Sequence, residues 1–196
     1  MKKYLLCAIV SLLFIGNSCC NKCKNLEDET INITDQQKNF IQYSGTDTLY
    51  FLNDNNDSIE YFGQGKQQDF KLIETEEGSC SVTKYEEEIK IVFISNVGDS
   101  ITISLNADHQ SRLADLDHVI DKHDFNYNVE SDGSNGIGWD TLNLGNFIYY
   151  KVRISSGGND SNKTLKIYFT TKEGLISYEL PDGNGAYIRW YRYFLE

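Results

Sequence analysis

The clearest strand pattern in the chain lies at residues 146–194, NFIYYKVRISSGGNDSNKTLKIYFTTKEGLISYELPDGNGAYIRWYRYF. It contains four runs rich in β-branched and aromatic residues, a composition typical of strands, at 146–155, 164–171, 174–180 and 186–194. Short segments rich in Gly, Asn, Asp and Lys lie between these runs and favour tight turns. Three tight connections in succession predict an antiparallel meander.

Strand patterns also dominate residues 34–130. Runs of β-branched and aromatic residues lie at 47–52, 58–62, 69–73, 88–95, 100–105 and 125–130. Turn-forming clusters separate most of these runs. Thr34 precedes a short segment without Gly or Pro, so we expect a short helix at Asp35–Gln42 with Thr34 as its N-cap.

A second helix is predicted at Asn106–Lys122, which contains neither Gly nor Pro. Leu113, Leu116 and Ile120 recur at the helical period and form a narrow apolar stripe. Many strands with one inserted helix favour an antiparallel architecture over alternating strand–helix units. The expected fold is therefore mainly β: a single antiparallel β-sandwich or half-open barrel of about ten strands with one inserted amphipathic helix.

The N-terminus has the pattern of a secretion signal. Two lysines at positions 2–3 precede a 12-residue apolar run at 4–15, which is too short to span a membrane core. The segment IGNSC that follows resembles a bacterial lipoprotein processing site, in which Cys19 is lipidated and begins the processed chain. Gly16 stands where such sites most often carry Leu, and Cys20 is the alternative acceptor.

These features divide the chain into three parts. Residues 1–18 are expected to be a lipoprotein signal peptide, 19–33 the lipidated cysteine with a polar tether, and 34–196 the β-rich domain that contains the meander. We expect secretion across the inner membrane and a lipid anchor in the cell envelope, at the outer membrane. The membrane would then be a partner through the N-terminal lipid.

Four cysteines remain once the predicted signal is removed: Cys19, Cys20, Cys23 and Cys80. In an oxidising compartment Cys80 can pair with Cys23 or Cys20, and we predict a Cys23–Cys80 disulfide. The alternative is that Cys80 is a small buried apolar residue.

The charge of the chain excludes one class of partner. With 29 acidic and 18 basic residues the net charge is −11, so no basic surplus exists to displace counterions from nucleic acid. The acidity is uneven, because residues 25–130 hold 22 acidic and 7 basic side chains whereas 131–196 hold 7 of each. We therefore expect a binding surface in the neutral, aromatic C-terminal part.

No pattern in the chain indicates catalysis or metal binding. The Gly-x-Ser-x-Gly nucleophile motif is absent. Asp115, His118 and Asp121 have a spacing that could hold a divalent metal on a helix, but a solvated polar face is the simpler interpretation. We expect no catalytic residue, no metal and no cofactor, and hence no enzyme.

The last strand carries the candidate binding surface, because its side chains alternate between two faces and one face collects tyrosine and arginine. The surface consists of Tyr187, Arg189, Tyr191 and Tyr193 from the last strand. Two tyrosines from neighbouring meander strands, Tyr149 and Tyr168, complete it. Such a face can stack on sugar rings or bind a partner protein. Cross-strand packing within a sheet would produce the same pattern.

The meander also resembles the C-terminal part of short bacterial lipoproteins. The shared features are a Tyr-x-x-Val segment at Tyr149–Val152, a glycine between two strands at Gly174, and an Asp-Gly turn at Asp182–Gly183. The resemblance covers the meander only and implies a β-rich lipoprotein. That family carries no agreed activity, so it implies no catalytic residues.

Three functions are compatible with this sequence. The preferred one is a lipid-anchored, non-catalytic binding or interaction module for a protein or a glycan. The alternative is a carrier that holds an apolar ligand in a half-open barrel, with the 106–122 helix as a lid over an enclosed cavity. The third is a hydrolase of surface polymers, which needs at least two carboxylates facing across one cleft.

Overall fold

The structure is a computed structural model. It describes residues 28–77, 80–108, 114–129, 138–144, 147–160, 163–181, 184 and 186–193. Within these ranges it contains one short helix and twelve strands. The elements are β1 (Glu29–Ile31), α2 (Asp35–Lys38), β2 (Thr48–Asn53), β3 (Ser58–Glu77), β4 (Cys80–Ser95), β5 (Ser100–Ala107), β6 (Ala114–Ile120), β7 (His123–Val129), β8 (Gly138–Leu144), β9 (Phe147–Asp160), β10 (Lys163–Thr170), β11 (Gly174–Pro181) and β12 (Tyr187–Tyr193).

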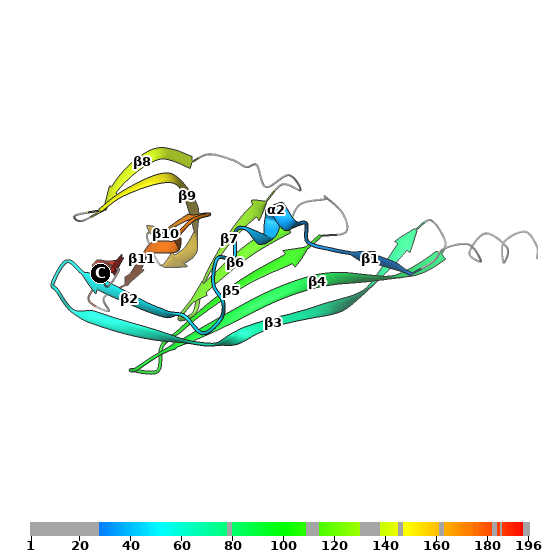
Figure 1. Cartoon of the computed structure of the whole chain (residues 1–196), viewed down its shortest axis with the longest axis horizontal. Helices are drawn as coiled ribbons and strands as arrows, with labels where there is room; N and C mark the ends of the chain where they lie inside the picture. The colour runs from blue at the N-terminus through cyan, green and yellow to red at the C-terminus, as the bar shows by residue number, and fades with distance from the viewer. Residues whose placement is uncertain are drawn as a thin grey trace, which may run out of the picture.

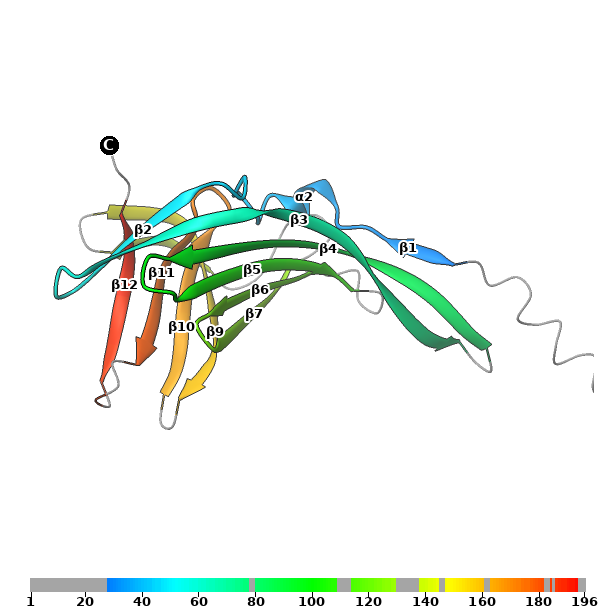
Figure 2. The same ribbon diagram turned by 90° about the horizontal axis from the view of Figure 1, so that it is seen from below.

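The strands belong to one sheet, so the predictions of a mainly β fold and of antiparallel pairing are confirmed. Its main path is antiparallel in the order β7-β6-β5-β4-β3-β2-β12-β11-β10-β9-β8. The β2–β12 pair joins an N-terminal half to the C-terminal meander, and the two halves turn toward each other (Figures 1 and 2). Ser155 Oγ on β9 donates a hydrogen bond to the Asn126 carbonyl oxygen on β7, 2.5 Å away. Because β7 and β8 are the two ends of the path, the sheet is open and is not a closed barrel.

The C-terminal meander is confirmed. The strands β9, β10, β11 and β12 are successive antiparallel neighbours, and their bounds lie close to the predicted runs. Gly174 begins β11 with φ +72°, and a Cβ atom there would lie only 2.2 Å from the Tyr43 hydroxyl oxygen. Glycine is therefore required at this turn, because any side chain would collide with the core.

The predicted helix at 106–122 is wrong over the part that the structure describes. Residues 106–107 end β5 and Ala114–Ile120 forms β6, whereas 109–113 lie outside the described residues. In β6 every second side chain is buried, including Leu116, His118 and Ile120, which is the period of a strand. Leu116 and Ile120 are four residues apart, a spacing that helices and strands share, so the apolar stripe did not distinguish them.

Two predicted strands, 58–62 and 69–73, are parts of the single long strand β3. The glycine-rich segment between them is a β-bulge and not a turn, because the register slips between Gly63 and Lys66. Gly65 adopts φ +113° at the bulge. The hairpin of β3 and β4 extends past β5, β6 and β7 (Figure 2), since β5 pairs with β4 only over 88–94.

The core lies between the two halves of the sheet. It is built from buried apolar side chains of β2 to β7, β10 and β11, together with residues 33–43. Aromatic rings meet edge to face within it: Phe51 and Tyr178 have centroids 4.9 Å apart, and Tyr43 and Phe93 are 5.2 Å apart. A second, smaller cluster of buried side chains lies on β9, β10 and β11 and consists of Tyr149, Val152, Tyr168 and Ile176.

Residues 29–44 form an N-terminal strap across the sheet. Its helix α2 has the predicted N-cap, Thr34, within a capping box, but it ends at Lys38 and not at the predicted Gln42. The strap is held by Glu87 on β4, whose carboxylate accepts hydrogen bonds from the Ile33 backbone N–H at 2.7 Å and from Gln68 at 2.7 Å, and pairs with Lys38 at 2.9 Å. Part of the predicted tether, residues 29–33, thus belongs to the folded structure, because β1 pairs in parallel with β4.

Candidate functional site

The predicted binding surface centres on β12, between β11 and β2. Arg189 lies directly opposite Glu179 of β11, and Tyr191 lies opposite Leu52 of β2. Because alternate residues share a face, Arg189 and Tyr191 point to one side, whereas Trp190 packs against the main core on the other. Tyr187 stands at the start of β12, where it packs against the main core although the strand alternation would place it with Arg189 and Tyr191.

An arginine–carboxylate pair forms the centre of this face. Arg189 donates two hydrogen bonds to Glu179 Oε1, from Nη2 at 2.5 Å and from Nε at 3.1 Å. The Glu179 side chain is almost fully buried, while that of Arg189 is partly exposed. The Arg189 guanidinium carbon also lies 5.5 Å from the centroid of the Tyr168 ring. These contacts hold Arg189 in place, so its charge is largely committed within the protein.

The first half of β9 folds back and buries two of the predicted tyrosines. β9 pairs with β8 up to Arg153 and with β10 from Arg153 onward, and Lys151 near this switch has φ +55°. The Tyr149 hydroxyl reaches the Arg192 carbonyl oxygen at 3.5 Å, so this part of β9 lies against β12. Tyr149 is 6% exposed and Tyr168 is 7% exposed. Neither ring contributes to an open binding surface.

Burial explains the altered acidity of these phenols. It raises the pKa of Tyr149 to about 12 and also raises the pKa of Tyr168, although the Arg189 charge opposes the second shift. Burial raises the pKa of Tyr191 as well, and the nearby charge of Asp54 adds to this. All three tyrosines therefore remain neutral hydrogen-bonding groups at pH 7.

The residues that the fold exposes in this region are mostly different from the predicted ones. Ile148 is 59% exposed and Tyr150 is 67% exposed on β9, and Tyr193 is 41% exposed at the end of β12. We call these three residues the aromatic rim. The hydrogen bond between the Tyr149 hydroxyl and the Arg192 carbonyl oxygen connects β9 to β12, while Ile148 and Tyr150 lie on the face of β9 opposite Tyr149. Tyr150 was missed because it neighbours Tyr149, and only the position of β9 over β12 decides which of the two faces outward.

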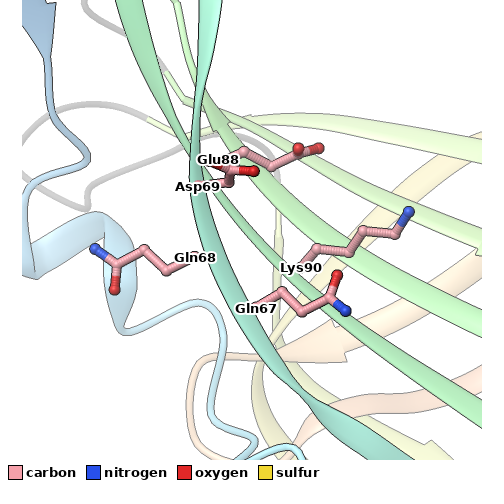
Figure 3. A pocket seen from close by; sticks show the side chains of 5 residues that line it. All are labelled: Gln67, Gln68, Asp69, Glu88 and Lys90. Atoms are coloured by element: carbon pink, nitrogen blue, oxygen red, sulfur yellow. The ribbon is translucent and has the colours of Figure 1, made fainter.

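A polar hollow lies on the β3–β4 hairpin and is lined by Gln67, Gln68, Asp69, Glu88 and Lys90 (Figure 3). Gln68 points to the opposite side of the hairpin from the other four side chains (Figure 3). Asp69 and Glu88 are direct cross-strand neighbours, and Glu88 forms an ion pair with Lys71 at 2.8 Å. Two adjacent carboxylates on an exposed sheet do not face each other across a cleft, as glycoside hydrolysis requires.

The histidine–aspartate set considered as a metal site is not brought together. In β6 the His118 side chain faces the core, whereas Asp115 lies on the alternate, partly exposed face. Burial lowers the pKa of His118 to about 3, and its ring lies 5.3 Å from that of Phe169. His118 Nδ1 has no hydrogen-bond partner among the described residues. Within the same residues no group of three or more His, Cys, Asp or Glu side chains could hold a metal ion.

Most of the predicted lipidation and disulfide residues lie outside the described part of the chain. Cys19, Cys20 and Cys23 are outside the described residues, and of Cys80 only the backbone, paired with Glu77, is described. In the part of the chain that is described, no helix has the length and apolar character needed to cross a membrane.

Comparison with known proteins identifies no relative. No family model matches the chain, and neither the curated proteins nor the solved structures contain a significant match.

Proposed function

We propose that the protein is a lipid-anchored, non-catalytic binding module of the cell envelope whose ligand is an envelope glycan. The observation that carries this proposal is the aromatic rim. Ile148 and Tyr150 expose more than half of their surface on one face of β9, and Tyr193 is exposed at the end of β12. Exposed apolar groups that share a face, as Ile148 and Tyr150 do, are typical of interaction sites.

The rim rests on a rigid support, which favours binding. Tyr149 packs beneath β9 in the smaller buried cluster, and the Arg189–Glu179 pair braces the strands below it. A ligand that stacks on Tyr150 therefore costs little conformational entropy in the protein. Tyrosine suits this role, because its ring offers a flat apolar face and its hydroxyl can bond to a sugar hydroxyl.

The anchor is proposed to be the lipid on Cys19, with Cys20 as the alternative, placed at the outer membrane after secretion. The basic start, short apolar run and IGNSC segment support this proposal. Labelled palmitate fed to expressing cells should enter the full-length chain. Cys19→Ala should abolish the label and Cys20→Ala should preserve it, and equal labelling of both single variants and their double variant would contradict the anchor.

Binding can be tested by sedimenting the full-length chain, in nonionic detergent, with purified peptidoglycan sacculi. The wild type should sediment with the sacculi, and Tyr150→Ala with Tyr193→Ala should weaken the binding constant about thirtyfold, since the two lost aromatic contacts together remove about 2 kcal/mol. Phe62→Ala is the matched control, because Phe62 is equally exposed, at 41%, on β3. Absence of binding by the wild type, or equal loss in the control, would contradict the glycan proposal.

An apolar-ligand carrier is the second candidate. The sheet is open and folds around the main core as a sandwich or half-open barrel would, and His118 places a polar ring in that apolar interior. Two observations oppose the carrier function. Ring centroids in the same interior lie within 5.3 Å of each other, which leaves little room for a ligand. The segment expected to form a helical lid instead contains the strand β6. Binding of the fluorescent apolar probe N-phenyl-1-naphthylamine at one site per chain would favour the carrier over the glycan module.

A further inference from the structure

The outer edge of β3 is open along most of its length. β2 pairs with β3 only over 58–62, and residues 45 and 47 accept the N–H groups of Gly65 and Gly63. Beyond this point, none of the described residues pairs with the outer edge of β3 from Lys66 to Glu77, although β4 pairs with its inner edge throughout. Figure 1 shows this part of β3 along the margin of the molecule. A strand edge of this length is a template for another strand.

The open edge presents apolar side chains. Phe70 is 45% exposed and Leu72 is 57% exposed, and both lie on the face that continues the core side of the sheet. Asp69 Oδ1 accepts a hydrogen bond from the Phe70 backbone N–H at 2.8 Å. Every second amide of an antiparallel strand points away from its partner, and the bond to Asp69 favours Phe70 as one of the residues whose amides point to the open edge.

The sequence of the edge is complementary to itself. Around Phe70 the order is Lys66, Gln67, Gln68, Asp69, Phe70, Lys71, Leu72, Ile73, Glu74. Positions at equal distance on the two sides of Phe70 carry opposite charges: Asp69 matches Lys71, and Lys66 matches Glu74. An antiparallel pair of identical strands places these positions directly opposite one another.

We propose that two copies of the chain pair antiparallel through the β3 edge, with Phe70 facing the partner's Phe70 on a two-fold axis. In this register Asp69 faces the partner's Lys71 and Lys66 faces the partner's Glu74, and each pair occurs twice by symmetry. The Phe70 amide exchanges its bond to Asp69 for one to the partner strand, which leaves Asp69 free to meet the partner's Lys71.

Neighbouring registers lose this complementarity. Moving the axis to Lys71 sets Lys71 against the partner's Lys71, and moving it to Asp69 sets two carboxylates face to face. Asp69 lies opposite Glu88 within its own sheet, and the partner's Lys71 adds a second cation beside the Lys71 that already pairs with Glu88. Charge and apolar pattern together thus select one alignment.

A charge-swap experiment on the full-length chain tests this proposal. Sedimentation equilibrium in density-matched nonionic detergent should show a monomer–dimer equilibrium for the wild type at micromolar concentrations. Lys71→Asp and Asp69→Lys should each weaken the dimer at least tenfold, because each places two like-charged pairs across the axis. The double variant Asp69→Lys with Lys71→Asp should return the dissociation constant to within about threefold of the wild type.

The controls separate pairing from folding and from detergent effects. Lys122→Asp makes the same charge change in the exposed β6–β7 turn and should leave the dimer unchanged, and far-UV circular dichroism should be equal for all variants. A wild type that is monomeric up to about 100 μM would overturn the proposal. So would a dimer that the single variants do not weaken, or one that the double variant fails to restore.

Discussion

The fold changes the acid–base chemistry of His118. This residue stands in β6 among apolar side chains, and burial holds its pKa at about 3, far below the ordinary value of 6.5. At a pH between 3 and 6.5, the His118 imidazole is protonated in the unfolded chain and neutral in the folded chain. The stability that the neutral ring contributes is therefore complete above pH 6.5 and falls as the pH drops toward 3.

The change His118→Leu should remove this dependence. Relative to the variant, the wild type should lose about 2 kcal/mol of unfolding free energy between pH 7 and pH 5, since each pH unit below 6.5 costs about 1.4 kcal/mol. Urea unfolding of both proteins at the two pH values measures the difference. Equal losses in the two proteins would show that His118 is accessible to protons in the folded state.

At the scale of elements, the sequence predicts strands better than it predicts their ends or faces. The meander was predictable because Gly and Asn-Gly turns separate its runs and because consecutive strands pair locally. The strand in the 106–122 segment was not predictable, since the spacing of Leu116 and Ile120 fits both a helix and a strand. Pairing with β5 and β7 decides in favour of the strand. The aromatic rim was only partly predictable, because the return of β9 over β12 decides that Tyr149 is buried and Tyr150 exposed.

The attachment of the N-terminal strap to β4 is expected to depend on Glu87. Glu87→Gln removes the charge that pairs with Lys38 and weakens the bond to the Ile33 amide in a buried place, so we expect a loss of about 2–3 kcal/mol in unfolding free energy. Glu88→Gln is the matched control, because the ion pair of Glu88 with Lys71 is solvent-exposed and should change stability by less than about 1 kcal/mol. Chemical denaturation measures both, and equal losses would contradict the role of Glu87 as the attachment point of the strap.

At the scale of the whole molecule, two surfaces lie on different parts of the sheet. The aromatic rim belongs to β9 and β12 in the meander, whereas the open β3 edge belongs to the N-terminal half. If two chains pair through β3, each dimer presents two rims to a polymeric ligand. Two linked sites raise the effective affinity for a repeating glycan without any new contact.

Hydrogen exchange of the full-length chain, with and without soluble peptidoglycan fragments, locates the binding surface. Ligand should slow amide exchange in 147–150 and at the end of β12, and leave the polar hollow on β3–β4 unchanged. Exchange in 66–74 should depend on protein concentration but not on ligand. Protection confined to the polar hollow, or no protection at the rim at saturating fragment concentration, would contradict the assignment of the aromatic rim as the binding surface.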